Sequence, residues 1–375
     1  MMAAEKNEDM ADNTKGSKKK NTEILDKLGQ KIYDQISKGE NPYFDLPTRG
    51  LSNVTYSEEK RILMMGSGLS RRYFLNVGHV RKFVQTVAMA ALSKELIQSD
   101  KHTSLRSAFY QVRRTIPGTK IDIVDDQTET NKAIEDLELI TDLTREQLHI
   151  NANKAGAVAG EVVVEDRGDV IDWSKMGSGG WAIPSNVEDL IFKKIDAKFV
   201  IYMEKQTIWD RLNEDKAWKK LNCIIIASQG QATRGIRRLL QRLNKEHNLP
   251  VYILTDGDIW GVYIYSTIKF GSITLASASD KLALPEAKFM GLTMDDIERY
   301  GLKRHLIKFK DVDISRLNQI KNYEWFKKSK QWMEELSKME KLGAKVELDA
   351  FTAKGLSFMT EHYLPEKLKE KNFLD

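Results

Sequence analysis

Val251-Tyr-Ile-Leu-Thr-Asp256-Gly257-Asp258 is an apolar run that ends in two carboxylates on either side of a glycine. Short apolar runs of this kind form buried strands, and residues that follow a strand of an α/β sheet lie at the carboxyl edge of that sheet. Carboxylate oxygens are the hard ligands that Mg²⁺ prefers. The stretch therefore predicts a largely parallel sheet with an acidic edge suited to a metal ion.

A second apolar run ends in the same way. Ala197-Lys-Phe-Val-Ile-Tyr-Met203 is followed directly by Glu204. If the two strands are neighbours, Glu204, Asp256 and Asp258 converge on one cation, and carboxylates around Mg²⁺ usually serve phosphate chemistry. The alternative is that Asp-Gly forms an ordinary turn and that Glu204 only begins a helix.

The chain around these two runs alternates between strand and helix patterns. We expect strands at 197–203, 221–227, 250–255 and 272–276, with helices at 206–217, 232–246 and 259–269. Alternation of this kind predicts a mostly parallel sheet with both faces covered. The remainder, from about 280 onward, has helical patterns whose aromatic residues we interpret as packing.

The N-terminal half has a different pattern. We expect helices at 71–98, 104–114, 131–138 and 144–152, and an alternating β-like segment follows at 158–164. Helices followed by a small β-wing are the outline of a winged-helix domain. We therefore expect a multidomain α/β (α+β) protein. Its parts are a disordered basic arm at 1–20, an extension at 21–69, the winged-helix domain at 70–155, a linker with a β segment at 156–195, and a domain with a helical C-terminal elaboration at 196–375.

Composition limits the possible classes of protein. With 375 residues, 41% hydrophobic and 30% charged, the chain has the make-up of a globular protein with two or three domains. The net charge of +5 permits nucleic acid as a partner. Cys223 is the single cysteine, which excludes a disulfide within the chain and fits the cytoplasm. No run has the length of a membrane span, and Gly177-Ser-Gly-Gly180 lacks the Gly-Lys-Ser/Thr of a Walker A motif.

The helix predicted at 104–114 carries a second group of chemically useful residues. Arg106 and Tyr110 lie four residues apart and share one face, with Arg113 and Arg114 near the same helix end. A tyrosine beside a guanidinium and near a metal can attack phosphorus, because the arginine stabilises both the phenolate and the phosphoryl oxygens. Taken alone, the same residues also fit a half-buried tyrosine next to a solvated basic face.

The residues around Tyr110 and the three carboxylates resemble the active-site motifs of a known protein family. Ser104-Leu-Arg106-Ser-Ala-Phe-Tyr110 resembles the Thr-x-Arg-Asp-x-Tyr-Tyr active-site motif of the type IIB topoisomerases and the related meiotic double-strand-break proteins. Glu204 and Thr255-Asp256-Gly257-Asp258 match the Toprim metal site of that group, and the agreement, greatest with archaeal topoisomerase VI A subunits, runs from about residue 70 to the C-terminus. Ser107 stands where the motif has aspartate, and Phe109 where it has its first tyrosine.

The resemblance implies a fold and a reaction. A winged-helix cleavage domain would precede a Toprim domain; Tyr110, assisted by Arg106, would form a 5′-phosphotyrosyl link to DNA. Glu204, Asp256 and Asp258 would hold Mg²⁺, or Glu204 would instead handle a proton. The DNA phosphates would be bound by Arg71, Arg72, Arg81, Lys82, Arg113 and Arg114.

The same resemblance implies partners. Two A subunits would form a homodimer and join two B subunits, which bind ATP, in an A2B2 heterotetramer that relaxes and decatenates DNA in the nucleoid. Three alternatives stay open. They are a recombination-initiating protein of the same family that cuts without routine resealing, a non-catalytic winged-helix DNA-binding protein, and a Toprim primase or nuclease without a tyrosine nucleophile.

Overall fold

The structure is a computed structural model that describes residues 2–152 and 154–375, with the backbone alone over 2–15 and at residue 17. The chain forms two compact units. The first unit comprises Met1–Val54 and Met65–Asn153, and the second comprises Thr55–Met64 and Lys154–Asp375. Among the described residues, no helix combines the length and the apolar character that crossing a membrane requires.

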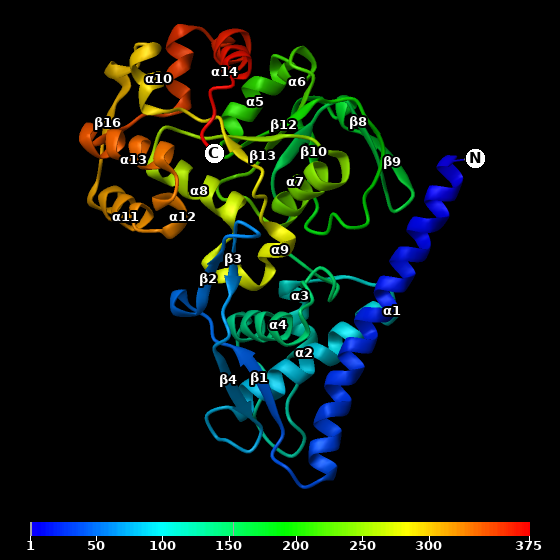
Figure 1. Ribbon diagram of the computed structural model, residues 1–375. Coiled ribbons are helices and arrows are strands. Elements are labelled where there is room, and N and C mark those ends of the chain that lie inside the picture. The colour runs from blue at the N-terminus through cyan, green and yellow to red at the C-terminus, as the bar shows by residue number, and fades with distance from the viewer. Residues whose placement is uncertain (1, 153) are drawn as a thin grey trace. The chain divides into compact units, whose positions relative to one another are not determined.

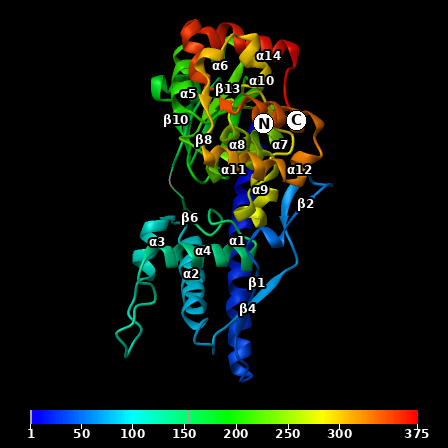
Figure 2. The same cartoon turned by 90° about the vertical axis from the view of Figure 1, so that its left-hand side faces the viewer.

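Helices make the core of the first unit. Its long elements are α1 (Met2–Ser37), α2 (Val80–Gln98), α3 (Leu105–Val112) and α4 (Gln127–Thr141). Two strand pairs complete it: β1 (Tyr43–Pro47) with β4 (Leu69–Tyr73), antiparallel, and β5 (Thr103–Ser104) with β6 (Ile150–Asn151), parallel. Figure 2 shows α3 beside α2 and α4, and the core between the helices includes Leu25, Met89, Phe109, Ile134 and Leu137.

The first unit differs from the sequence prediction at three places. The helix predicted at 71–98 begins only at Val80, because 71–73 pair with β1. The helix predicted at 144–152 is wrong: the segment forms turns and β6. The disordered arm predicted at 1–20 is helical backbone from Met2, and Lys18 is tied to the unit by an ion pair with Asp100 at 2.6 Å.

A six-stranded sheet forms the centre of the second unit (Figure 1), with strand order β10-β7-β13-β12-β14-β15. The predicted parallel sheet is confirmed by β12 (Phe199–Met203), β13 (Cys223–Ala227), β14 (Val251–Leu254) and β15 (Lys288–Phe289). β7 (Ala157–Ala159) and β10 (Trp181–Ala182) extend it antiparallel. The strand predicted at 272–276 is wrong, since 273–278 form a 3₁₀ helix and β15 is the fourth parallel strand.

Helices connect the parallel strands. α5 (Gln206–Glu214) and α6 (Ala217–Lys220) lie between β12 and β13, α7 (Arg234–His247) leads to β14, and α8 (Ile259–Phe270) follows β14. Crossovers between parallel strands are right-handed. From β12 the chain moves to β13 on one side, and it then returns past β12 to β14 and β15 on the other side. Because the direction of movement reverses, α5 and α6 cover one face of the sheet, and α7 and α8 cover the other. The carboxyl ends of the four strands remain at one edge.

Smaller elements surround this sheet. The C-terminal part is largely helical, as predicted, with α9 (Ser279–Leu282), α10 (Met294–Arg299), α11 (Asp311–Lys321), α12 (Glu324–Lys327), α13 (Lys330–Leu342), α14 (Leu364–Glu370), and the pair β16 (Ile307–Lys308) and β17 (Ala344–Lys345). The aromatic residues predicted to pack do so: Phe326 and Trp332 are fully buried.

The strands predicted as a wing lie elsewhere. Val158 belongs to β7 of the six-stranded sheet, and β8 (Val162–Asp166) forms a three-stranded sheet with β9 (Asp169–Asp172) and β11 (Ile191–Ile195). Both sheets belong to the second unit, so these strands are not a wing of the helical unit. The alternating pattern indicated one β-like segment, which the structure divides into two strands, and pairing partners such as Ile191 and Ile225, 26 and 66 residues away, decide the sheets.

A hairpin from the N-terminal half also belongs to the second unit. β2 (Val54–Ser57) and β3 (Ile62–Met65) form it. The Tyr56 ring lies 6.0 Å from Phe270 and 6.1 Å from Trp325, and Lys60 forms an ion pair with Asp280 at 3.0 Å. The extension predicted at 21–69 is therefore divided between the two units.

Candidate active site

The two apolar runs singled out in the sequence are neighbouring strands. Met203 of β12 lies opposite Leu254 of β14, so Glu204 and Asp256 leave the sheet at the same edge. Asp258 is the N-cap of α8, where its side chain accepts a hydrogen bond of 2.7 Å from the Gly261 N–H. Glu204 does not cap a helix, since α5 begins after Lys205, and the alternative that it is only a helix-start residue is not supported.

The carboxylates at this edge repel one another. Burial raises the pKa of Glu204 to about 7, and the negative charges of Asp258 and Asp256 add to this effect. Burial also raises the pKa of Asp256 and of Asp258, although hydrogen bonds from the Leu348 N–H and the Gly261 N–H oppose the rise. A cation among these side chains would relieve the repulsion.

A lysine that the sequence analysis missed already contacts this group. Lys205 Nζ lies 2.8 Å from Asp256 Oδ2, 2.9 Å from Glu347 Oε2 and 3.0 Å from Asp349 Oδ2. The other Asp256 oxygen, Oδ1, accepts a hydrogen bond of 2.8 Å from the Leu348 N–H. Burial acts to lower the pKa of Lys205, but the hydrogen bonds to Asp256 and Glu347 outweigh it, so the pKa is raised.

The fold brings this acidic segment to the strand edge. Gly257 pairs with Val346 in an isolated β-bridge, which places 347–349 beside Asp256. A Cβ at position 257 would lie 3.0 Å from Val346 Cγ1, so the close approach favours glycine there. The adjacency of Lys205 to Glu204 was visible in the sequence, but about ninety residues separate 347–349 from Asp256, and no local pattern indicates their contact.

The side chains of Glu204, Asp256 and Asp258 suit Mg²⁺ chemically, because they supply carboxylate oxygens. These carboxylates are buried or half-buried and repel one another, so a cation among them would be stabilising. Their arrangement is not yet that of a metal site. In the described part of the chain, no three His, Cys, Asp or Glu side chains are gathered as ligands of one ion. The convergence of the three carboxylates on a single point therefore stays a prediction, and in this arrangement Asp256 is paired with Lys205.

The other predicted catalytic side chain lies on α3 in the first unit. The Ser104 hydroxyl caps the helix by accepting a hydrogen bond of 3.1 Å from the Ser107 N–H. Phe109 is buried in the core, whereas Tyr110 is 59% exposed and Arg106, one turn earlier, is also exposed. Phe109 thus serves packing, whereas Tyr110 is accessible to a ligand.

The basic residues predicted to bind DNA phosphates are largely engaged within the first unit. Arg71 pairs with Asp45, Arg72 with Asp136, Arg81 with Asp125 and Glu129, and Arg113 with Asp122. Lys82 and Arg114 are exposed. Arg72 is only 17% exposed, so its role in holding Asp136 is structural. The positive charge available to a ligand is therefore smaller than the residue types alone indicate.

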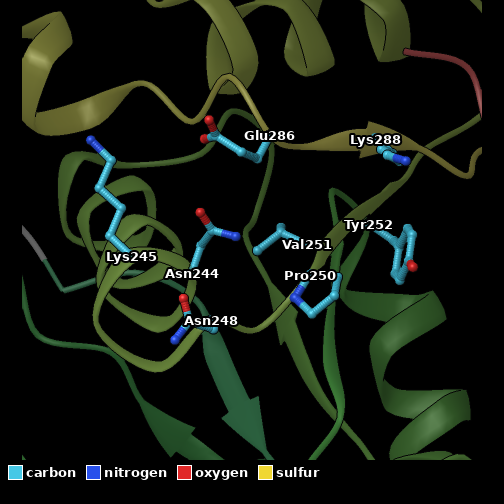
Figure 3. Close-up of a pocket in the computed structure, with 8 residues that line it drawn as sticks. All are labelled: Asn244, Lys245, Asn248, Pro250, Val251, Tyr252, Glu286 and Lys288. Carbon is cyan, nitrogen blue, oxygen red and sulfur yellow. The ribbon is translucent and has the colours of Figure 1, made fainter.

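A pocket of about 530 Å³ lies at the opposite end of β14 (Figure 3). Its lining includes Asn248, Pro250 and Tyr252 at the start of the strand, with Glu286 and Lys288 facing them. Glu286 is paired with Arg61 at 3.2 Å. Because β14 begins at this pocket and ends before Asp256, the pocket is not part of the carboxylate site.

Family models match three consecutive parts of the chain. Residues 199–368 match the Toprim domain of the topoisomerase 6 A subunit/Spo11 family, residues 81–150 match the type IIB DNA topoisomerase model, and residues 152–196 match the all-beta domain of the DNA topoisomerase VI alpha chain. The first match contains all three carboxylates, and the second contains Arg106 and Tyr110.

Curated relatives match nearly the whole chain. The A subunit of the type 2 DNA topoisomerase 6 of Pyrococcus abyssi is 46% identical over 360 residues, which are 93% of this chain and 94% of the relative. The proteins of the same name from Saccharolobus shibatae and Methanothermobacter thermautotrophicus are 38% and 36% identical. These alignments cover 96% and 92% of this chain, and 97% and 96% of the relatives.

Proposed function

Because the chain belongs to the family of topoisomerase 6 A subunits, we propose that it is the A subunit of an ATP-dependent type IIB DNA topoisomerase. It makes a transient double-strand break in DNA, through which a second duplex passes. With a B subunit that binds ATP, it relaxes and decatenates DNA. The catalytic unit is an A2B2 heterotetramer built on a homodimer of A subunits.

Tyr110 carries the covalent step. Its hydroxyl gives up a proton, and the oxygen attacks a DNA phosphorus. A bond forms between the tyrosine oxygen and the 5′ phosphate while the bond to the 3′ oxygen breaks, and that oxygen takes up a proton and leaves as a 3′ hydroxyl. The bond energy is retained in the phosphotyrosyl link for resealing. Arg106, exposed one turn earlier on the same helix, stabilises the phenolate and the charge on the phosphoryl oxygens.

Glu204, Asp256 and Asp258 are the proposed ligands of Mg²⁺. When bound, Mg²⁺ stabilises the charge on the phosphoryl and 3′ oxygens. The chain's own contribution is to bring carboxylates from β12 and β14 to one edge of a rigid sheet, where their raised pKa values favour a cation. That shared edge, within the residues that match the Toprim model, is the observation that carries the proposal.

The experiment is a relaxation assay with supercoiled DNA, a B subunit, ATP and Mg²⁺. We expect relaxation by the wild type, and none by Tyr110→Phe or after Mg²⁺ is chelated. Linear DNA that is never resealed would favour the recombination-initiating alternative. Cutting by Tyr110→Phe would favour a nuclease, and DNA binding with no metal-dependent cleavage would leave only a DNA-binding protein.

A further inference from the structure

Lys205 is shared among three carboxylates that come from two distant parts of the chain. Its ammonium contacts Asp256 at the end of β14, and also Glu347 and Asp349 in the segment paired with Gly257. Its side chain is 28% exposed, whereas Asp256 is 8% exposed. The contact with Asp256 is therefore the least solvated of the three, while the other two acceptors lie nearer the solvent, with side chains 47% and 44% exposed.

The position of this ammonium matters because a metal ion bound to Asp256 would share the carboxylate with a second cation. The Asp256 Oδ1 is held by the Leu348 N–H, and its Oδ2 is the atom that Lys205 contacts. Because Oδ1 already accepts a backbone hydrogen bond, Oδ2 is the oxygen with more free acceptor capacity for a metal ion, and it is also the oxygen that Lys205 contacts. A divalent cation at Oδ2 and an ammonium at 2.8 Å from the same atom would repel each other strongly.

We propose that Lys205 is an internal competitor for the metal site, which occupies Asp256 in the absence of a divalent ion and moves onto Glu347 and Asp349 when the ion binds. The inference rests on the proposed function, since it takes Asp256 as a Mg²⁺ ligand. It accounts for the contact of an ammonium with Asp256 at a strand edge where the carboxylates repel one another.

Glu347 and Asp349 make the exchange possible without expelling the lysine into solvent. Lys205 already contacts both, so a change of side-chain rotamer that lengthens the Asp256 contact leaves two charge-assisted hydrogen bonds in place. The site then gains a divalent ion at Oδ2 and keeps the charge of Lys205 balanced. Binding of the metal is weaker than the carboxylates alone would give, because the ammonium must first be displaced.

The test is the affinity of the full chain for Mg²⁺ alone, measured by isothermal titration calorimetry without DNA or a B subunit. Lys205→Met should bind Mg²⁺ about ten-fold more tightly than the wild type, because a unit positive charge beside the site is removed. Lys321→Met is the matched control. Lys321 is also half-buried and pairs with Glu340 at 2.7 Å, and its loss should change the affinity by less than about three-fold.

A double-mutant cycle separates displacement from general electrostatics. Glu347→Gln with Asp349→Asn should weaken Mg²⁺ binding in the wild type, because the displaced ammonium loses its acceptors. The same pair should have a much smaller effect in Lys205→Met, where no ammonium is displaced. Equal effects in the two backgrounds would mean that the acidic pair acts only through its charge, and this would overturn the exchange.

The outcomes distinguish the competitor role of Lys205 from the proposed Mg²⁺ site itself. If the wild type binds Mg²⁺, Asp256→Ala does not, and Lys205→Met binds with unchanged affinity, the competitor role is wrong while the metal site stands. If the wild type and Lys205→Met both fail to bind Mg²⁺, the proposed function loses its metal site. Should Lys205→Met fail to fold by circular dichroism, Lys205→Gln retains a donor for Asp256 and is expected to show the same ten-fold tightening, whose absence would equally refute the inference.

Discussion

The three motif carboxylates have different second roles, which the structure separates residue by residue. Glu204 makes no cap, and its pKa is raised to about 7 by burial and by its acidic neighbours. Asp258 is a helix cap as well as a proposed ligand. Asp256 accepts both the Leu348 N–H and Lys205. Removal of the carboxylate is therefore expected to stabilise the metal-free protein only at Glu204, although all three residues are proposed ligands of the same ion.

We predict opposite stability changes at two of these positions in the absence of metal. Glu204→Ala should raise the melting temperature, because it removes a carboxylate that its neighbours repel. Asp258→Ala should lower the free energy of unfolding by about 1 kcal/mol through loss of the α8 cap, whereas Asp258→Asn should retain the cap. Thermal and urea unfolding of the three variants check this. A Glu204→Ala variant that is less stable than Asp258→Ala would contradict the assignment.

At the scale of elements, α8 is packed against the loop that carries Asp256. A Cβ at Gly261 would lie 2.7 Å from Thr255 Oγ1 and 2.8 Å from the Asp256 carbonyl oxygen. Alanine is favoured over glycine in a helix interior by about 1 kcal/mol. Overpacking usually costs about 1–3 kcal/mol, and the carbonyl belongs to the backbone and cannot rotate away.

We therefore predict that Gly261→Ala destabilises the protein by about 1 kcal/mol and reduces Mg²⁺-dependent DNA cleavage, because it moves α8 away from Asp256. Urea unfolding and the cleavage assay measure both effects. Gly29→Ala on α1 is the control, since a Cβ there meets no atom within 4 Å and should be neutral or stabilising. If Gly261→Ala is as stable and active as Gly29→Ala, the close packing of α8 on the loop is not a constraint.

A buried carboxyl on α13 gives a pH dependence. Glu335 is 5% exposed and accepts a hydrogen bond of 2.7 Å from the Met294 N–H. Burial raises its pKa to about 7; the Met294 N–H and Lys338 oppose the rise, while Asp295 and Asp296 add to it. Between pH 4.5 and 7 the folded state thus holds a proton that the unfolded state has released.

Stability should consequently fall as the pH rises through this window, and the contribution of Glu335 is at most about 3 kcal/mol. Glu335→Gln cannot titrate and should have a flatter curve of unfolding free energy against pH across this window. Glu334→Gln, at a neighbouring exposed position, should keep the slope of the wild type. Parallel curves for Glu335→Gln and the wild type would show that this carboxyl ionises normally.

Elements with strong local patterns could be predicted from the sequence, and those that depend on distant partners could not. β12, β13 and β14 are short apolar runs with helices between them, so both their existence and their shared edge were predictable. β7 and β8 were predicted as one β-like segment at 158–164, and their division between two sheets depends on pairing with β13 and β11. The segment 144–152 was assigned to a helix, although Leu148, Ile150 and Ala152 alternate, and Ile150 pairs with Thr103 in β6.

The site was predictable to the same extent. Glu204, Asp256 and Asp258 were proposed because each follows a predicted strand, and the structure brings the ends of the two strands to one sheet edge. Lys205 and its acceptors Glu347 and Asp349 were missed, because their contact depends on a bridge between Gly257 and Val346. Arg72 and Arg81 were assigned to DNA by residue type, whereas their ion pairs to Asp136 and Glu129 depend on how α4 packs.

At the scale of the whole molecule, the proposed chemistry is divided between the two units. The proposed nucleophile Tyr110 belongs to the first unit, and the carboxylates belong to the second. The alignments with the relatives cover both units. Neither unit has both components of the proposed reaction, and cleavage is expected to require the intact chain.

The central claim is that Tyr110 becomes joined to the 5′ phosphate of DNA. The most direct measurement incubates the chain, a B subunit, ATP and Mg²⁺ with DNA that carries a radiolabelled internal phosphate, denatures the mixture, digests it, and maps the labelled peptide by mass spectrometry. The account predicts a phosphotyrosyl link at Tyr110, free 3′ hydroxyl ends, and no labelled protein from Tyr110→Phe, which still binds DNA. A label on another residue, a 3′ link, or cleavage by the wild type with no covalent adduct would contradict it.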